Sequence, residues 1–122
     1  MKNILHYFVL ILIFCTNFSC TNANEDDLTE NLPEPDLVTY SEHIKPVVDN
    51  NCLLCHSNPP QNGAPMHLTT YGAVKGAVEN LNLIARISSN DPSFRMPLGG
   101  QPLPQQTINL FIQWESDDFP EN

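Results

Sequence analysis

Two cysteines and a histidine stand close together near the middle of the chain, as Cys-Leu-Leu-Cys-His at residues 52–56. Thiol and imidazole groups at this spacing permit three kinds of chemistry: covalent attachment of a haem, a redox-active dithiol, or half of a zinc site. The rest of the sequence has to distinguish among the three.

The spacing itself favours haem attachment. On a helical turn, Cys52 and Cys55 project to the same side, where their thiols can reach the two vinyl groups of one haem and become thioethers. The adjacent His56 then points at the iron as its proximal ligand. Dithiols of the thioredoxin type follow a strand in an α/β setting, which this sequence lacks. A zinc-binding or structural lipoprotein, with zinc held by Cys52, Cys55, His56 and His67, stays open as the alternative.

A second candidate iron ligand lies in the stretch Phe-Arg-Met-Pro-Leu-Gly-Gly, residues 94–100. Pro97 disfavours helical geometry at Met96, and Gly99 with Gly100 lets the backbone turn back on itself. The thioether of Met96 can therefore reach a metal as its distal ligand. His67 is the rival ligand, and two histidines would give a lower reduction potential than histidine with methionine.

The N-terminus predicts export from the cytoplasm. Lys2 precedes an uncharged apolar run over residues 7–14, so we interpret residues 1–19 as a secretory signal peptide. The run is much shorter than the roughly 20 residues needed to span a bilayer. Cys20 follows Asn-Phe-Ser, which resembles a bacterial lipoprotein box, and ordinary cleavage after Ala23 is the alternative. We expect a lipid on Cys20 and a mature protein at the cell envelope, on the periplasmic side or in the outer membrane.

Residues 20–36 are acidic and contain Pro33 and Pro35, which predicts a disordered, lipid-anchored tether. The remaining domain, residues 37–122, is so small that its apolar core needs additional stabilisation, such as a bound prosthetic group. The whole chain carries 14 acidic and 5 basic residues, a net charge of −9. This charge makes nucleic acid an improbable partner. It could steer redox proteins with basic docking surfaces, and the equally open alternative is a solvated surface that keeps the protein soluble.

Four helical segments and no strand are predicted, so the fold class is all-α. The first covers residues 40–50, with Thr39 and Glu42 as a possible capping box and Pro46 either in its first turn or at a kink. The second covers 70–79, the third centres on 83–87, and the last begins at Pro104. The expected inner positions of the second and last helices are Tyr71, Val74, Val78, Leu81, Ile108, Phe111 and Ile112. The loops 57–69 and 90–103 are long for so small a domain.

From about residue 40 to residue 114 the chain resembles a small monohaem cytochrome c domain of exported bacterial proteins. The matching positions are Ile44, Pro46, Cys52, Cys55, His56, Met96, Pro97, Gly99, Gly100, Leu103 and Trp114. After the tryptophan the family often continues with an apolar residue and Gly-Ala, whereas this chain has acidic residues over 115–118.

This resemblance implies about four short helices around one covalently bound haem c, with His56 and Met96 as axial ligands. It also implies an electron carrier at the cell envelope rather than an enzyme, acting alone or as the partner of a larger oxidoreductase. Arg86 and Arg95 are candidates to pair with the haem propionates, and a solvated role is equally open for each.

Overall fold

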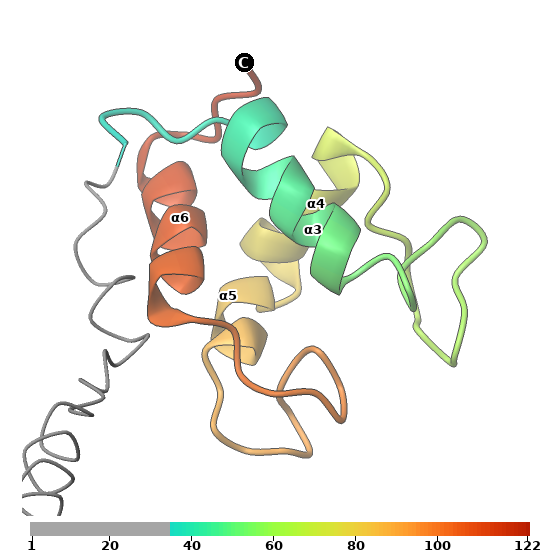
Figure 1. The fold of residues 1–122 in the computed structure, drawn as a ribbon. Coiled ribbons are helices and arrows are strands. Elements are labelled where there is room, and N and C mark those ends of the chain that lie inside the picture. Colours follow the sequence, from blue (N-terminus) through green and yellow to red (C-terminus); the bar gives the residue numbers. More distant parts are fainter. Residues whose placement is uncertain (1–34) are drawn as a thin grey trace, which may run out of the picture. The chain divides into compact units, whose positions relative to one another are not determined.

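The computed structural model describes residues 35–122, which belong to one compact unit. Its helical elements are η2 (Tyr40–Ile44), α3 (Lys45–Asn51), α4 (Tyr71–Asn80), α5 (Leu83–Ile87) and α6 (Gln105–Ser116). This part of the chain contains no strand, so the predicted all-α class is confirmed for it (Figure 1). The predicted signal peptide, the lipidation site Cys20 and nearly all of the predicted tether lie outside the described residues. Within residues 35–122, no helix has the length and apolar character that a membrane crossing requires.

The first helical segment begins with one half of the predicted capping box. The side chain of Thr39 accepts a hydrogen bond from the backbone N–H of Glu42 at 3.4 Å. The Thr39 N–H donates to Nδ1 of His43 at 3.1 Å and not to the Glu42 side chain, so the other half is not formed. Pro46 falls in the first turn of α3, as one of the two predicted arrangements requires. A proline ring clashes with the carbonyl group four residues earlier and has no N–H to donate. The chain accommodates this by opening the preceding turn, η2, into a π-helical turn.

Helix α4 is capped by Thr70, whose hydroxyl accepts from the backbone N–H of Ala73 at 3.2 Å. Its inner face is only partly the predicted one. Val74 and Val78 are buried, but the prediction for Leu81 is wrong, because that side chain is 47% exposed. The helix ends at residue 80, and Leu81 has left helical geometry, so it no longer follows the apolar stripe.

Helix α6 follows directly after Pro104, which caps the helix in an extended conformation instead of occupying its first position. Ile108, Phe111 and Trp114 are buried, whereas Ile112 is 45% exposed, so the prediction that Ile112 faces inward is wrong. At about 100° per residue, Ile112 lies roughly a quarter turn away from Phe111, the centre of the buried stripe.

An aromatic cluster closes the end of the domain near the C-terminus. Tyr40, Tyr71, Trp114 and Phe119 pack with ring centroids 4.9 to 6.0 Å apart. The indole N–H of Trp114 donates to the Pro120 carbonyl at 2.9 Å, and the Tyr71 hydroxyl donates to the Phe119 carbonyl at 2.8 Å. The chain after α6 is therefore tied back onto α6 and α4.

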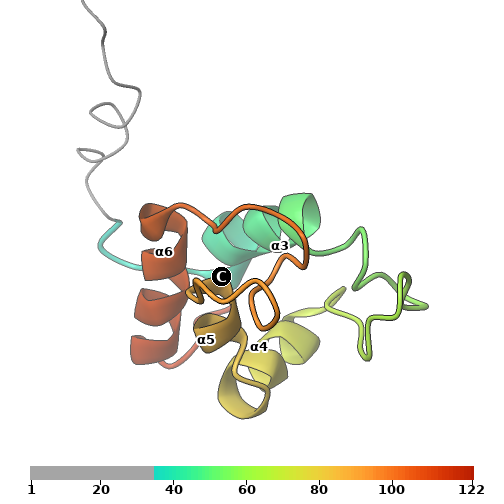
Figure 2. The same cartoon turned by 90° about the horizontal axis from the view of Figure 1, so that it is seen from below.

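The two long loops lie on the side of the domain away from the C-terminus (Figure 1). Seen from below, loop 90–103 passes in front of the helices, and loop 57–69 extends beside α3 and α4 (Figure 2). Both loops flank the segment that follows α3, which holds the Cys-x-x-Cys-His motif.

Candidate functional site

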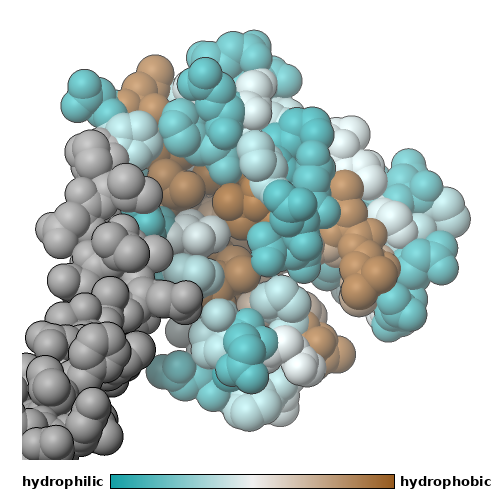
Figure 3. All heavy atoms as spheres, in the orientation of Figure 1, coloured by the Kyte–Doolittle hydropathy of each residue, from teal (hydrophilic) through white to brown (hydrophobic). Residues whose placement is uncertain are grey.

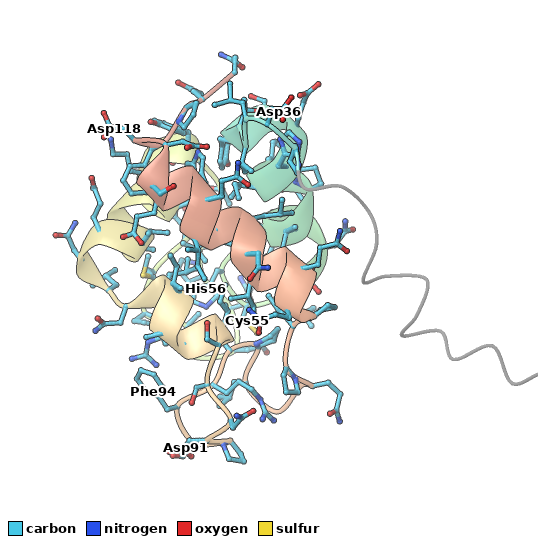
Figure 4. The ribbon with its side chains drawn as sticks, turned by 90° about the vertical axis from the view of Figure 1, so that its left-hand side faces the viewer. Asp36, Cys55, His56, Asp91, Phe94 and Asp118 are labelled. Carbon is cyan, nitrogen blue, oxygen red and sulfur yellow. The ribbon has the colours of Figure 1, made fainter. Side chains whose placement is uncertain are left out.

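The Cys-x-x-Cys-His motif forms a tight turn at the end of α3. The backbone N–H of Cys52 donates to the Val48 carbonyl at 2.9 Å and so continues the helix. The N–H groups of Cys55 and His56 then both donate to the Cys52 carbonyl, at 3.1 and 2.9 Å. The backbone of the motif therefore forms one turn, which carries Cys52, Cys55 and His56. In Figure 4, Cys55 and His56 are seen in the middle of the domain, behind α6.

The ring of His56 is oriented by a backbone group. Its Nδ1 lies 2.9 Å from the carbonyl oxygen of Met66. A carbonyl oxygen can only accept a hydrogen bond, so Nδ1 carries the proton and donates it. The other ring nitrogen, Nε2, keeps its lone pair and is the atom through which His56 can bind a metal.

Loop 57–69 folds back onto the motif and holds this arrangement. The backbone N–H of Gln61 donates to the Cys55 carbonyl, and that of Leu68 donates to the His56 carbonyl, both at 2.8 Å. The side-chain amide of Asn62 also donates to Cys55 Sγ at 3.7 Å. The sequence indicated only that this loop is unusually long, and it missed these partners and the orienting carbonyl of Met66.

The two thiols differ in their surroundings. Both are free thiols, and burial raises the pKa of Cys52 to about 11. Redox-active dithiols depend on a cysteine whose pKa is lowered, because the thiolate is the reacting form. Cys52 therefore does not supply the reactive thiolate that such a dithiol needs.

The zinc alternative needs His67 beside the motif. His67 is half-buried, and its Nδ1 lies 3.2 Å from the Thr69 hydroxyl. Over residues 35–122, no three His, Cys, Asp or Glu side chains come together in a way that could hold a metal ion. The described part of the chain thus gives the zinc site no support.

Met96 lies in the second long loop and is held at the edge of the hydrophobic core. Its backbone N–H donates to the Arg86 carbonyl at the end of α5, at 3.0 Å. Across the loop, Nη2 of Arg95 donates to the Gly100 carbonyl at 2.9 Å. Gly99 has φ +73°, a left-handed conformation that glycine adopts without strain. As predicted, Met96 belongs to no helix and is placed by its loop.

Residues from both loops and from the motif border the same core. Several half-buried apolar side chains pack against it: Cys52, Leu53, Met66, Met96 and Leu103. Figure 3 shows a hollow between the lower lobe, which loop 90–103 forms, and the right-hand lobe beyond α3, with hydrophobic atoms along its margin. The motif and Met96 thus meet one continuous apolar cluster from two sides. Comparisons of the chain with protein-family models, with curated proteins and with solved structures found no match.

Proposed function

We propose that this protein is an electron carrier with a cytochrome c-like fold and one haem c, bound covalently through Cys52 and Cys55. His56 and Met96 are the proximal and distal ligands of its iron. The observation that carries the proposal is the hydrogen bond from His56 Nδ1 to the Met66 carbonyl. It orients the ring and leaves Nε2 free for a metal, and the same backbone turn carries Cys52 and Cys55.

The chemistry of the donor set fits this group. Each thiol can add across one vinyl group, forming a carbon–sulfur bond while its hydrogen goes to the neighbouring carbon. An imidazole nitrogen and a thioether are a known pair of axial ligands for haem iron. The half-buried apolar side chains at the edge of the core offer the hydrophobic contact that a porphyrin needs. Leu54 and Leu98, 82% and 68% exposed, add apolar surface in the motif and in the Met96 loop.

The bound haem would supply a one-electron couple, and the chain's own residues would set its properties. The hydrogen bond to the Met66 carbonyl makes His56 a more basic ligand. A thioether ligand from Met96 raises the reduction potential relative to a second histidine. Because both axial positions would be filled by side chains, a substrate finds no open metal site. This favours an electron carrier over an enzyme, alone or as a partner of a larger oxidoreductase.

The proposal includes a location at the cell envelope. Residues 1–19 would direct export, Cys20 would carry the lipid, and residues 20–36 would tether the domain to the membrane. In the described domain, the cations Lys45 and Lys75 lie beside Asp49 and Glu79 on the same helices. The surplus acidic charge is therefore free to steer redox partners with basic docking surfaces.

A redox titration of the exported protein tests this function. The full chain is produced in a host equipped for haem maturation, and its visible spectrum is followed as the potential is changed. We expect one reversible one-electron transition between ferric and ferrous spectra. A double variant, Cys52→Ala with Cys55→Ala, serves as the control and should lack covalent haem. A colourless but folded wild-type protein contradicts the proposal.

A further inference from the structure

Arg95 has a buried donor without an acceptor. Its Nη2 donates to the Gly100 carbonyl at 2.9 Å, whereas its Nε is buried and has no hydrogen-bond partner among the described residues. Leaving a buried donor unsatisfied costs its desolvation without any compensation, and the cost is larger when the group is charged. The arrangement therefore calls for an acceptor that the polypeptide over residues 35–122 does not provide.

One acidic side chain, Asp91, interacts with the charge of Arg95 but accepts no hydrogen bond from its Nε. Asp91 lies in the same loop, and its Oδ1 accepts from both the backbone N–H and the hydroxyl of Ser93, at 2.9 and 2.8 Å. The ion pairs of the described domain join Lys45 with Asp49 and Lys75 with Glu79, and neither includes Arg95. An acceptor for Nε must then come from a ligand, and the planar fork of a guanidinium matches a carboxylate best.

We propose that Arg95 donates its Nε–H to a propionate carboxylate of the haem, an inference that rests on the function proposed above. Arg95 immediately precedes Met96, so the residue that would bind the iron and the residue that would bind the carboxylate share one short loop. The hydrogen bond from Arg95 Nη2 to the Gly100 carbonyl spans that loop and holds Arg95 and Met96 in place. Arg95 is in this sense a positioning residue for the haem as well as a charge partner for it.

Arg86 offers a matched comparison. It carries the same charge and lies in α5, whose last turn accepts the backbone N–H of Met96. Its guanidinium instead stacks over the Phe94 ring, with Cζ 4.5 Å from the ring centroid, and donates to the Phe94 carbonyl at 3.4 Å. Substituting the Arg86 side chain removes a nearby positive charge but leaves the Arg86 carbonyl that holds Met96.

The physical consequence concerns the reduction potential. An anionic propionate near the iron stabilises the more positive ferric state, and a guanidinium bonded to it offsets this effect. Loss of the Arg95 guanidinium should therefore lower the potential. Loss of the Arg86 guanidinium should lower it less, because that group stacks on Phe94 and is not the partner of the propionate in this proposal.

The test uses the haem-loaded full chain and its variants Arg95→Gln, Arg95→Lys and Arg86→Gln. Reduction potentials are compared in samples whose ferric far-red band shows that methionine is still bound, and resonance Raman spectra report the propionate bending mode. We expect Arg95→Gln to lower the potential more than Arg86→Gln and to shift the propionate mode. Arg95→Lys should restore part of the potential, since it keeps the charge, but it should not restore the mode.

The possible outcomes separate this inference from the proposed function. If Arg95 only holds the loop through its hydrogen bond to Gly100, Arg95→Gln should weaken methionine binding without shifting the propionate mode. That result overturns the inference. The inference is also overturned if the wild type binds haem but the variants Arg95→Gln and Arg86→Gln shift the reduction potential equally. A wild-type protein that binds no haem overturns the proposed function, and the inference falls with it.

Discussion

His56 and Met66 are joined by a hydrogen bond between a side chain and the backbone, 2.9 Å from imidazole Nδ1 to carbonyl oxygen. The nine residues between them form most of loop 57–69, so the loop that follows the motif also orients its histidine. The acceptor belongs to the backbone, so a substitution of the Met66 side chain leaves it in place.

The identity of the proximal ligand can be tested by comparing two histidines. In His56→Ala the thioethers can still form, but the iron loses its imidazole, so the ferric spectrum should change from low-spin to high-spin. His67→Ala should keep the low-spin spectrum, because Nδ1 of His67 lies beside the Thr69 hydroxyl and the residue is not a ligand in our proposal. Absorption spectra of the two purified variants decide this. The reverse pattern would contradict the assignment of His56.

The distal ligand is tested at Met96, with Met66 as its matched control. Met96→Ala should abolish the ferric far-red band, open the iron to cyanide and peroxide, and lower the potential by a share of the roughly 0.8 V range that axial ligands cover. Met66→Leu should leave all three properties unchanged, since it keeps the backbone carbonyl that accepts from His56 and replaces one apolar side chain with another. Loss of the far-red band in Met66→Leu but not in Met96→Ala would reverse the assignment.

Stability should follow burial along α6. Trp114 is fully buried and donates to the Pro120 carbonyl, so Trp114→Ala should lower the free energy of unfolding by about 3–5 kcal/mol. Ile112 is 45% exposed, and Ile112→Ala should cost well under about 2 kcal/mol. Denaturant unfolding of the haem-loaded variants measures both values. Equal losses would contradict the arrangement of α6 in the structure.

The sequence predicted the helices well because their signals are local. Thr39 and Thr70 cap the first helical segment and α4 through contacts three residues away. The errors at Leu81 and Ile112 have a different origin. Whether either side chain faces the core depends on where a helix stops and on which stripe its neighbours cover, and neither is encoded within a few residues.

In the candidate site, too, local features could be predicted from the sequence and features that depend on packing could not. The spacing of Cys52, Cys55 and His56 places all three on one turn by local geometry alone, and their positions could be predicted. The acceptor for His56 is a backbone carbonyl, which every residue possesses, so no residue type marks Met66 for this role. The unpartnered Nε of Arg95 is likewise a property of packing and could not be recognised before the fold was known.

Membrane attachment is tested at Cys20, which the described residues do not include. If Cys20 carries the lipid, Cys20→Ala should move the exported protein from the membrane fraction to the soluble fraction of the producing cells. Cys15→Ala changes a cysteine inside the predicted signal peptide and should leave the protein with the membranes. Membrane attachment that survives Cys20→Ala would contradict the lipid anchor.

Covalent attachment of a single haem is the central claim, and the intact mass of the purified protein measures it most directly. After extraction with acidified organic solvent, we predict a mass equal to that of the processed chain plus one haem, with the colour remaining in the protein. Cys52→Ala and Cys55→Ala should each reduce the amount of protein that carries this added mass. A wild-type protein with the bare polypeptide mass, or one whose colour passes into the solvent, would contradict the account.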